Sequence, residues 1–287
     1  MTNIAWITDS TCALTEDYIK AHDIKVAPLK LILDDKEYKE MDELSYEEFY
    51  KLFDHNNQNA TTSQPPIGEF VEIYEDIRDN SDYEVAIAIH ASSKLTGTYQ
   101  SSLAASDQTG FKTYVIDSKV GSYPLSKMIE AGIEMAEQGH EIERIVEVIQ
   151  KMAHTLEMYL LPASLDQVKK SGRLTGAKSL LASILNLQLA IGFDDGAIVL
   201  KEKARSKKKL NTMIMNKMGE LINPEHVKEI CIMHCGNLDA VKEWEERIQS
   251  QFSSIRIVNQ YLAPVAGVHT GLGTISIGWV QDFKSFL

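Results

Sequence analysis

The sequence predicts an α/β protein of two domains, an N-terminal parallel-sheet Rossmann-like domain and a C-terminal mixed-sheet domain. In the first half, buried strand patterns alternate with amphipathic helix patterns, which is typical of parallel strands joined by right-handed crossovers. In the second half, Asp194-Asp195-Gly196 separates two strand patterns and indicates a hairpin with antiparallel strands. We place the boundary near residue 157, which gives the domains 1–157 and 158–287.

The first predicted domain alternates strands and helices. Apolar runs that can be covered on both faces predict its strands. Ser45 and Glu48 have the spacing of a capping box, and Ser63, followed by two prolines, opens a helix whose apolar stripe runs from Ile67 to Ile77. The predicted strands are 3–8, 25–33, 83–89 and 112–116, and two further helices are predicted over 122–138 and 142–155.

The second predicted domain mixes strand directions. Its hairpin is followed by helix patterns that alternate with short apolar runs. The predicted strands are 158–164, 188–193, 197–203, 227–234, 254–259 and 274–280, and the predicted helices are 206–221 and 238–252.

Composition excludes several classes of protein. With 41 Asp and Glu against 29 Lys and Arg, the 287 residues carry a formal charge of −12, which disfavours binding to a nucleic-acid backbone. No apolar run reaches the roughly 18 residues of a membrane span, and we expect a soluble, cytoplasmic protein. The sparse, odd set of three cysteines fits that compartment. Cys231 and Cys235 lie on one face of a strand pattern and His234 on the other, so we expect no metal site.

Short segments rich in small hydroxyl residues follow several predicted strands. Ligands of parallel α/β sheets bind beyond the carboxyl ends of the strands, and hydroxyl and amide groups at helix N-termini can receive a carboxylate or a phosphate. Helix capping explains any one segment equally well, but four at one sheet edge favour a binding site. The segments are Asp9 to Cys12, Thr61 to Pro66, His90 to Thr98 and Asp117 to Lys119.

Two glycine motifs lack the spacing of nucleotide-binding loops. Residues 172–179 have three residues between the glycines where a phosphate-binding loop has four, and residues 271–276 precede a strand where a dinucleotide fingerprint needs a helix. We therefore expect no nucleotide cofactor. The basic run 201–209, which includes Arg205, is either a solvated face or a patch for an anionic group, and Arg173 either caps carbonyls or holds an anion.

Six short segments, spread over almost the whole chain, matter by their sequences and by the order in which they follow one another. They are Thr8 to Thr11, Thr62 to Pro65, Ser92 to Ser101, Asp117 to Lys119, Lys169 to Leu174 and His269 to Thr274. Together they resemble the DegV family of bacterial fatty-acid-binding proteins, although none is specific by itself. Thr96 stands where the family often has serine, and Ser171 where glycine is common.

The resemblance implies a lipid-binding protein that holds one long-chain fatty acid in a tunnel completed by the second domain. In family members that act as the binding subunit of a bacterial fatty acid kinase, the partner kinase phosphorylates the carboxylate, and the acyl phosphate feeds phospholipid synthesis. The chain would then be a carrier and not an enzyme, with a fatty acid as ligand and no cofactor, and it would not insert stably into membranes. By position, Thr62, Ser93 and His269 would bind the carboxylate with Thr61 and Ser92 close by, and Arg173 and Arg205 would contact the head group or the kinase.

Two other functions stay open on the residues alone. A serine-dependent hydrolase or acyltransferase would use Ser93 as nucleophile, although no G-x-S-x-G elbow is present. A sensor or scaffold would bind some other small anion, with residues 207–209 as its docking face. The apolar stretch 180–185 either lines a tunnel or packs in the core.

Overall fold

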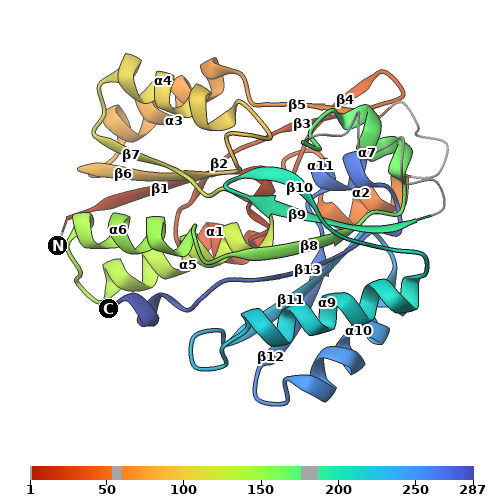
Figure 1. The fold of residues 1–287 in the computed structure, drawn as a ribbon. Helices are drawn as coiled ribbons and strands as arrows, with labels where there is room; N and C mark the ends of the chain where they lie inside the picture. Colours follow the sequence, from red (N-terminus) through yellow and green to blue (C-terminus); the bar gives the residue numbers. More distant parts are fainter. Residues whose placement is uncertain (1, 54–59, 176–186) are drawn as a thin grey trace.

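The computed structural model describes residues 2–53, 60–175 and 187–287, which form three β-sheets with helices packed around them (Figure 1). A parallel sheet lies in the N-terminal part and a mixed sheet in the C-terminal part, so the predicted fold class is confirmed. Every strand of the parallel sheet precedes residue 157, and the mixed sheet begins with Glu157. The predicted apolar stretch 180–185 lies outside the described residues.

The parallel sheet has the strand order β2-β1-β6-β7, and its side chains alternate between two cores. Ala5 and Ile7 face α3 and α4, while Trp6 faces the opposite side with α5 and α6. Figure 1 shows the first helix pair above the sheet and α1, α5 and α6 below it. The elements are β1 (Ile4–Asp9), β2 (Lys25–Ala27), β6 (Val85–His90), β7 (Thr113–Asp117), η1 (Ser10–Cys12), α1 (Glu16–Ala21), α3 (Ile67–Asn80), α4 (Thr98–Thr109), α5 (Tyr123–Glu137) and α6 (Ile142–Met152).

A three-stranded antiparallel sheet, absent from the sequence prediction, lies beside the parallel one. The run 25–33 was predicted as one strand, but it divides at Pro28 into β2, which joins the parallel sheet, and β3 (Lys30–Leu33), which pairs with β4 (Lys36–Lys39) and β5 (Thr61–Ser63). Proline lacks the N–H that a continuous ladder needs. Nearby, α2 (Tyr46–Leu52) begins with the predicted Ser45–Glu48 capping box, which is confirmed.

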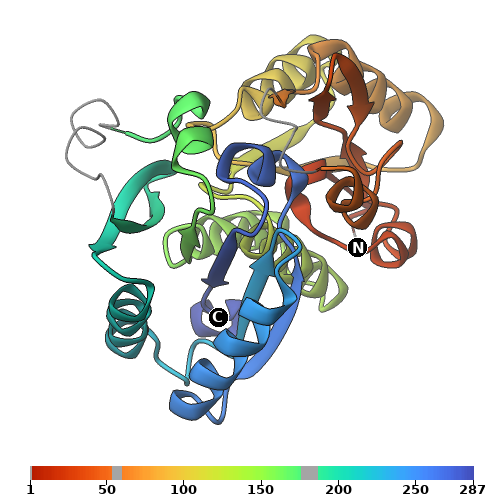
Figure 2. The ribbon, with the colours of Figure 1, turned by 90° about the vertical axis from the view of Figure 1, so that its right-hand side faces the viewer.

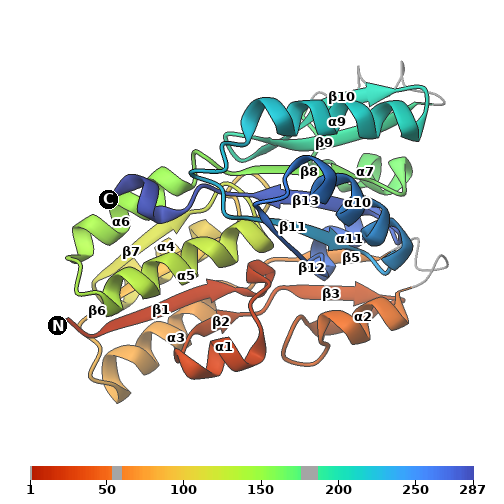
Figure 3. The same cartoon turned by 90° about the horizontal axis from the view of Figure 1, so that it is seen from below.

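The mixed sheet has the strand order β10-β9-β8-β13-β11-β12. The predicted hairpin is confirmed, because β9 and β10 pair antiparallel from Asp194 and Ala197 onward. In Figure 3, α9 and α10 run along this sheet, where Leu210 and Trp244 of the two helices are buried. The elements are β8 (Glu157–Leu161), β9 (Gln188–Asp194), β10 (Ala197–Ala204), β11 (Glu229–His234), β12 (Arg256–Tyr261), β13 (Ile275–Trp279), α9 (Lys207–Leu221), α10 (Leu238–Gln251) and η2 (Phe283–Phe286).

Two short helices lie where the two parts meet. The glycine-rich sequence of residues 264–274 predicts a bend around His269. The structure instead has the helix α11 (Pro264–Thr270) there, and it packs beside α7 (Leu165–Ser171). In Figure 2, the blue α11 lies between the two parts next to the green α7. Proline at the first helical position favours this helix start, and Gly271, with φ of +96°, follows its end. This helix brings His269 to the junction.

Candidate functional site

A cavity of about 390 Å³ lies at this junction, between the carboxyl end of the parallel sheet and the mixed sheet. Its volume is within the range of small-molecule sites. Apolar side chains of β8, β9 and β10, together with Val168 and Leu174, form an apolar wall of the cavity. The wall residues are Met158, Leu160, Val168, Leu174, Ile191, Phe193 and Ile198.

The lining also contains polar side chains. Thr62 of β5 and His269 of α11 both line the cavity, and the Thr62 Oγ1 lies 2.8 Å from the His269 Nε2. Burial lowers the pKa of His269 to about 3, and the positive charge of Arg173 acts in the same direction. The imidazole is therefore neutral at pH 7, so one ring nitrogen is a donor and the other an acceptor.

An open cleft of about 530 Å³ adjoins the cavity and shares Thr62, His269 and Arg173 with it. Lys170 and Thr61 line the cleft as well. The Arg173 guanidinium donates to the Leu95 carbonyl at 3.2 Å and to the Ser171 carbonyl at 3.0 Å. Arg173 thus caps carbonyls, which is one of the two interpretations that its position in the sequence left open, and it lines both the cavity and the cleft. Contact of Arg173 with an anion stays a prediction.

Ser92 and Ser93 are not part of the cavity lining. The Ser93 hydroxyl donates to the Asp117 carboxylate at 2.5 Å, and the Ser93 N–H donates to the same side chain at 3.2 Å. The Ser92 side chain is fully buried and donates to the Gly196 carbonyl at 2.8 Å. Their loop nevertheless reaches the cavity, which is lined by the following residues Leu95, Thr96 and Gly97. Contact of either serine with a carboxylate stays a prediction.

Arg205 and the basic run around it lie elsewhere. Arg205 is exposed between β10 and α9, and it lines neither the cavity nor the cleft. Lys207 pairs with Glu243 of α10 at 3.4 Å, and both side chains are largely exposed. Whether Arg205 meets a head group or a kinase stays a prediction.

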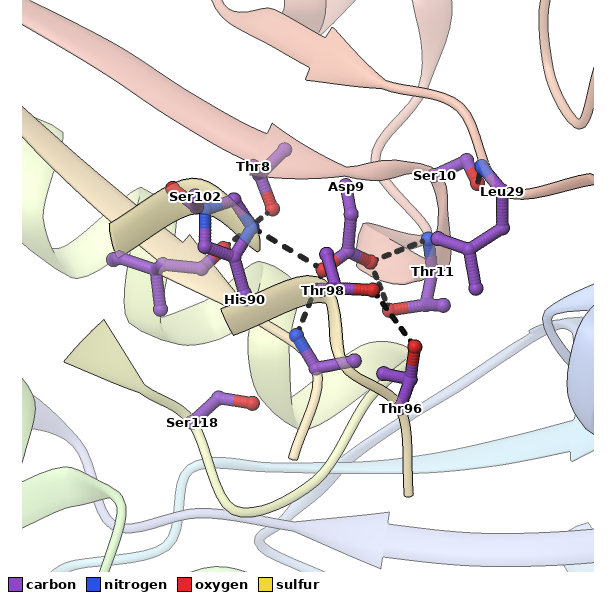
Figure 4. Close-up of polar contacts among 12 residues, drawn as sticks. Thr8, Asp9, Ser10, Thr11, Leu29, His90, Thr96, Thr98, Ser102 and Ser118 are labelled. Carbon is purple, nitrogen blue, oxygen red and sulfur yellow. Dashed lines mark hydrogen bonds and ion pairs between the residues drawn. The ribbon is translucent and has the colours of Figure 1, made fainter. Parts of the chain in front are cut away.

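A buried polar network behind the cavity was not predicted from the sequence (Figure 4). Asp9, at the end of β1, accepts from the Thr11 hydroxyl at 2.6 Å and from the Ala91 N–H at 2.8 Å. Both Thr11 and Ala91 line the cavity. The sequence signal was the segment 9–12, but its bond to a loop some eighty residues later depends on the pairing of β1 with β6.

The network continues in an order that resembles a serine protease triad. His90 lies between Asp9, with an Nδ1 to Oδ2 distance of 3.3 Å, and Ser102, with an Nε2 to Oγ distance of 2.8 Å. The Ser102 hydroxyl is fully buried, is bonded to Tyr74 and is absent from the cavity lining. No substrate can reach it there, and the His90 Nδ1 forms no hydrogen bond with Asp9, so this cluster is structural. Ser93, the nucleophile considered above, has no hydrogen bond to a histidine among the described residues.

The helix α11 is anchored by a buried carboxyl group from the other part of the chain. Glu40 is fully buried, and its Oε1 accepts from the Val265 N–H at 3.1 Å. Its Oε2 accepts from the Ser10 hydroxyl at 2.5 Å. Desolvation raises the pKa of Glu40 to about 8, and the nearby Asp9 adds to this shift. Glu40 thereby links η1 to the helix that carries His269.

In residues 2–53, 60–175 and 187–287, no group of three or more histidine, cysteine or acidic side chains is placed to hold a metal ion. None of the helices in these ranges is long and apolar enough to cross a membrane.

The fold and the cavity define a class of α/β protein with a cavity between a parallel and a mixed sheet. A model of the family described as "Uncharacterised protein, DegV family" matches residues 3–282. The chain belongs to the DegV family.

Relatives with solved structures share the whole fold. A structure described as DegV, a fatty acid binding protein from Bacillus subtilis, superposes with a TM-score of 0.88 at 28% identity, covering 98% of this chain and 100% of that one. A DegV domain-containing protein of Halalkalibacterium halodurans is 31% identical over 97% of this chain and 99% of its own length. A DegV domain-containing protein of Staphylococcus aureus is 31% identical over 96% of this chain and 97% of its own length. The match therefore extends over both sheets and over the cavity between them.

Proposed function

We propose that this protein binds one long-chain fatty acid in the junction cavity and presents its carboxylate to a separate fatty acid kinase, which converts it to an acyl phosphate for phospholipid synthesis. The single observation that carries the proposal is the cavity itself, with its apolar wall and with polar lining residues that it shares with an adjoining cleft. The similar Bacillus subtilis protein is described as fatty-acid-binding, which supports the same ligand class.

The free energy of binding a fatty acid fits a lining that has both apolar and polar residues. Burial of a methylene group contributes about 0.8 kcal/mol, so a sixteen-carbon tail contributes roughly 10 kcal/mol before ordering costs. The polar groups then contribute orientation more than affinity, since a carboxylate gains little net free energy when it exchanges water for neutral donors. A carboxylate held by hydroxyl groups, without a full ion pair, keeps its nucleophilic oxygen available.

We assign Thr62 and His269 as the carboxylate ligands, supported by their place in the lining and by their contact of 2.8 Å. Thr61, Ser92 and Ser93 enter the proposal on the family resemblance. Arg173 and Lys170 lie at the cleft, where positive charge favours a phosphoryl group that approaches the bound carboxylate.

The ligand class is tested by denaturing extraction and mass spectrometry of protein purified from bacterial cells. We expect close to one long-chain fatty acid per chain. An empty protein that also takes up no added palmitate contradicts the proposal.

The carboxylate assignment is tested in a coupled assay with a DegV-dependent fatty acid kinase. Thr62→Val keeps the shape of the side chain and removes its hydroxyl, and we expect it to lower acyl phosphate formation at least tenfold while palmitate still binds. Ser93→Ala is measured beside it. Thr113→Val, on β7, is the matched control. Unchanged turnover with Thr62→Val would remove Thr62 from the proposal.

A further inference from the structure

The hairpin β9–β10 has an unusual attachment to the rest of the molecule. Its two strands pair with each other at seven register positions. Its neighbour β8 pairs with β9 only through Tyr159 with Gly192 and Leu160 with Ile191. The sheet thus holds the middle of the hairpin, and the tip at residues 193–198 extends past β8 toward the loops of the parallel sheet (Figure 1).

Besides the backbone hydrogen bond from Thr175 to Ile198, two contacts of side chains hold that tip. The buried Ser92 hydroxyl donates to the Gly196 carbonyl at 2.8 Å, and Lys119 forms an ion pair with Asp195. Gly196 has a φ of +84°, and a Cβ at this position would lie 2.5 Å from the Ser92 Oγ. Glycine is therefore needed both for the turn and for the close approach of Ser92.

The same hairpin supplies part of the apolar wall. Ile191, Phe193 and Ile198 line the cavity, and the tip contacts lie directly beside them in the sequence. Movement of the tip away from Ser92 and Lys119 would uncover this side of the cavity without breaking the pairing between β9 and β10. The second strand of the hairpin, β10, is the edge strand of the mixed sheet. Beyond this edge, Ile198 is bridged to Leu174 and accepts from the Thr175 N–H at 2.8 Å, and this contact would have to break as the tip moves.

We propose that the hairpin is the movable wall through which the fatty-acid tail enters and leaves, and that Ser92 and the Lys119–Asp195 pair position it in the closed state. This inference rests on the proposed function. Sideways release lets the tail leave its apolar groove without being drawn lengthwise past Arg173 and the other polar lining residues. Ser92, which the resemblance placed near the carboxylate, acts here on the tail wall through Gly196.

The test measures release of a fluorescent fatty acid to excess lipid vesicles by stopped flow. Asp195→Asn removes the ion pair and keeps a residue that suits this turn, because asparagine before glycine favours the same turn type. We expect about threefold faster release, as for the loss of a partly exposed ion pair. Ser92→Ala leaves the Gly196 carbonyl without its donor, and we expect about three- to tenfold faster release. Asp194→Asn, the adjacent residue with the same change of charge, is the matched control.

Salt provides a readout that a general loss of stability would not reproduce. Release from the wild type should accelerate between low and high ionic strength, and this dependence should weaken in Asp195→Asn while it persists in Asp194→Asn. If Ser92→Ala and Asp195→Asn both release the probe at the wild-type rate, the hairpin is not the exit and the inference is wrong.

A separate measurement distinguishes this inference from the proposed function. Hydrogen exchange of residues 193–198, in protein without added lipid, should be faster in Asp195→Asn than in Asp194→Asn. If the protein binds no fatty acid, the proposed function fails and with it the role in release, whatever the exchange result. If it binds fatty acid but exchange and release are unchanged, only the hairpin inference fails.

Discussion

Gly97 has no side chain, and the space that this leaves is filled by the side chain of Gln64. A Cβ at Gly97 would lie 2.1 Å from the Gln64 Oε1, so the Gln64 carboxamide lies directly against the glycine backbone. The other end of that carboxamide donates to the Ser101 hydroxyl at 2.9 Å. Gly97 and Gln64 both line the cavity. The glycine between Thr96 and Thr98 is thus explained by packing, since its φ of −79° is ordinary for any residue.

We expect Gly97→Ala to displace Gln64 and to lower the free energy of unfolding by about 1 kcal/mol, the size of a lost side-chain hydrogen bond. In a Gln64→Ala background the same substitution should cost much less, because the group that it displaces is gone. Urea unfolding of the four proteins gives this double-mutant cycle. Additive effects of the two substitutions would show that Gln64 and Gly97 are not coupled.

His269 predicts an acid-sensitive stability. Its pKa is lowered from 6.5 to about 3 in the folded state, so the unfolded chain binds more protons between these values. The resulting stability is complete above pH 6.5 and is lost as the pH falls toward 3. From pH 7 to pH 5 we expect a loss of about 2 kcal/mol that His269→Gln does not show. Urea unfolding at both pH values measures it, and equal pH profiles for the two proteins would contradict it.

For individual residues, the sequence predicted which residues belong to the site better than it predicted their hydrogen-bond partners. Thr62 and His269 came from the resemblance, and both line the cavity. Their mutual contact spans 207 positions and needs β5 beside α11, which no local pattern encodes. Ser93 and Asp117 were both in predicted hydroxyl-rich segments, but their pairing depends on β6 lying beside β7.

Among the elements, α11 depends most on a distant residue. Its seven residues are too few for a stable isolated helix, and Glu40 supplies an acceptor for its Val265 N–H. The glycine-rich composition predicted a bend, because the tertiary contact that favours the helix is not visible in the segment itself. Likewise, the split of 25–33 at Pro28 follows from two sheets competing for one apolar run. The longer helices α5, α9 and α10 were predictable from their own apolar periodicity.

Glu40 gives the α11 anchor a pH dependence of opposite sign to that of His269. Its pKa is raised from 4.5 to about 8, so the folded state binds more protons in that interval, and stability falls as the pH rises through it. From pH 6 to pH 8 we expect the wild type to lose about 2 kcal/mol relative to Glu40→Gln. Chemical unfolding at the two pH values tests this. A difference between the two proteins that does not change with pH would exclude a raised pKa.

For the whole molecule, the main core extends across the predicted boundary at residue 157. One cluster of buried side chains includes Ile87 and Ile89 of β6 together with Leu160 of β8 and Ile191 of β9. The division into 1–157 and 158–287 describes the two large sheets, and independent folding of the two parts stays a prediction. The packing of one shared core favours a single cooperative transition.

We expect a bound fatty acid to stabilise the molecule as one unit, because the cavity takes its lining from both parts. Palmitate at a hundredfold excess over its dissociation constant should add about 2.7 kcal/mol to the free energy of unfolding. Across shorter saturated acids, each methylene removed should weaken binding about fourfold. Calorimetric titration with acids of eight to sixteen carbons measures this series. Affinity that does not depend on chain length would mean that the tail is not buried.

The three tryptophans are distributed in a way that makes such experiments direct. Trp6 is buried under the parallel sheet, whereas Trp244 and Trp279 are buried in the core of the mixed sheet. Replacing Trp6 by phenylalanine, or the other pair together, leaves an intrinsic fluorophore in one half at a time. A change in the tryptophan emission of each variant on addition of fatty acid, without any added dye, then shows whether binding alters the surroundings of the tryptophans on both sides of the junction.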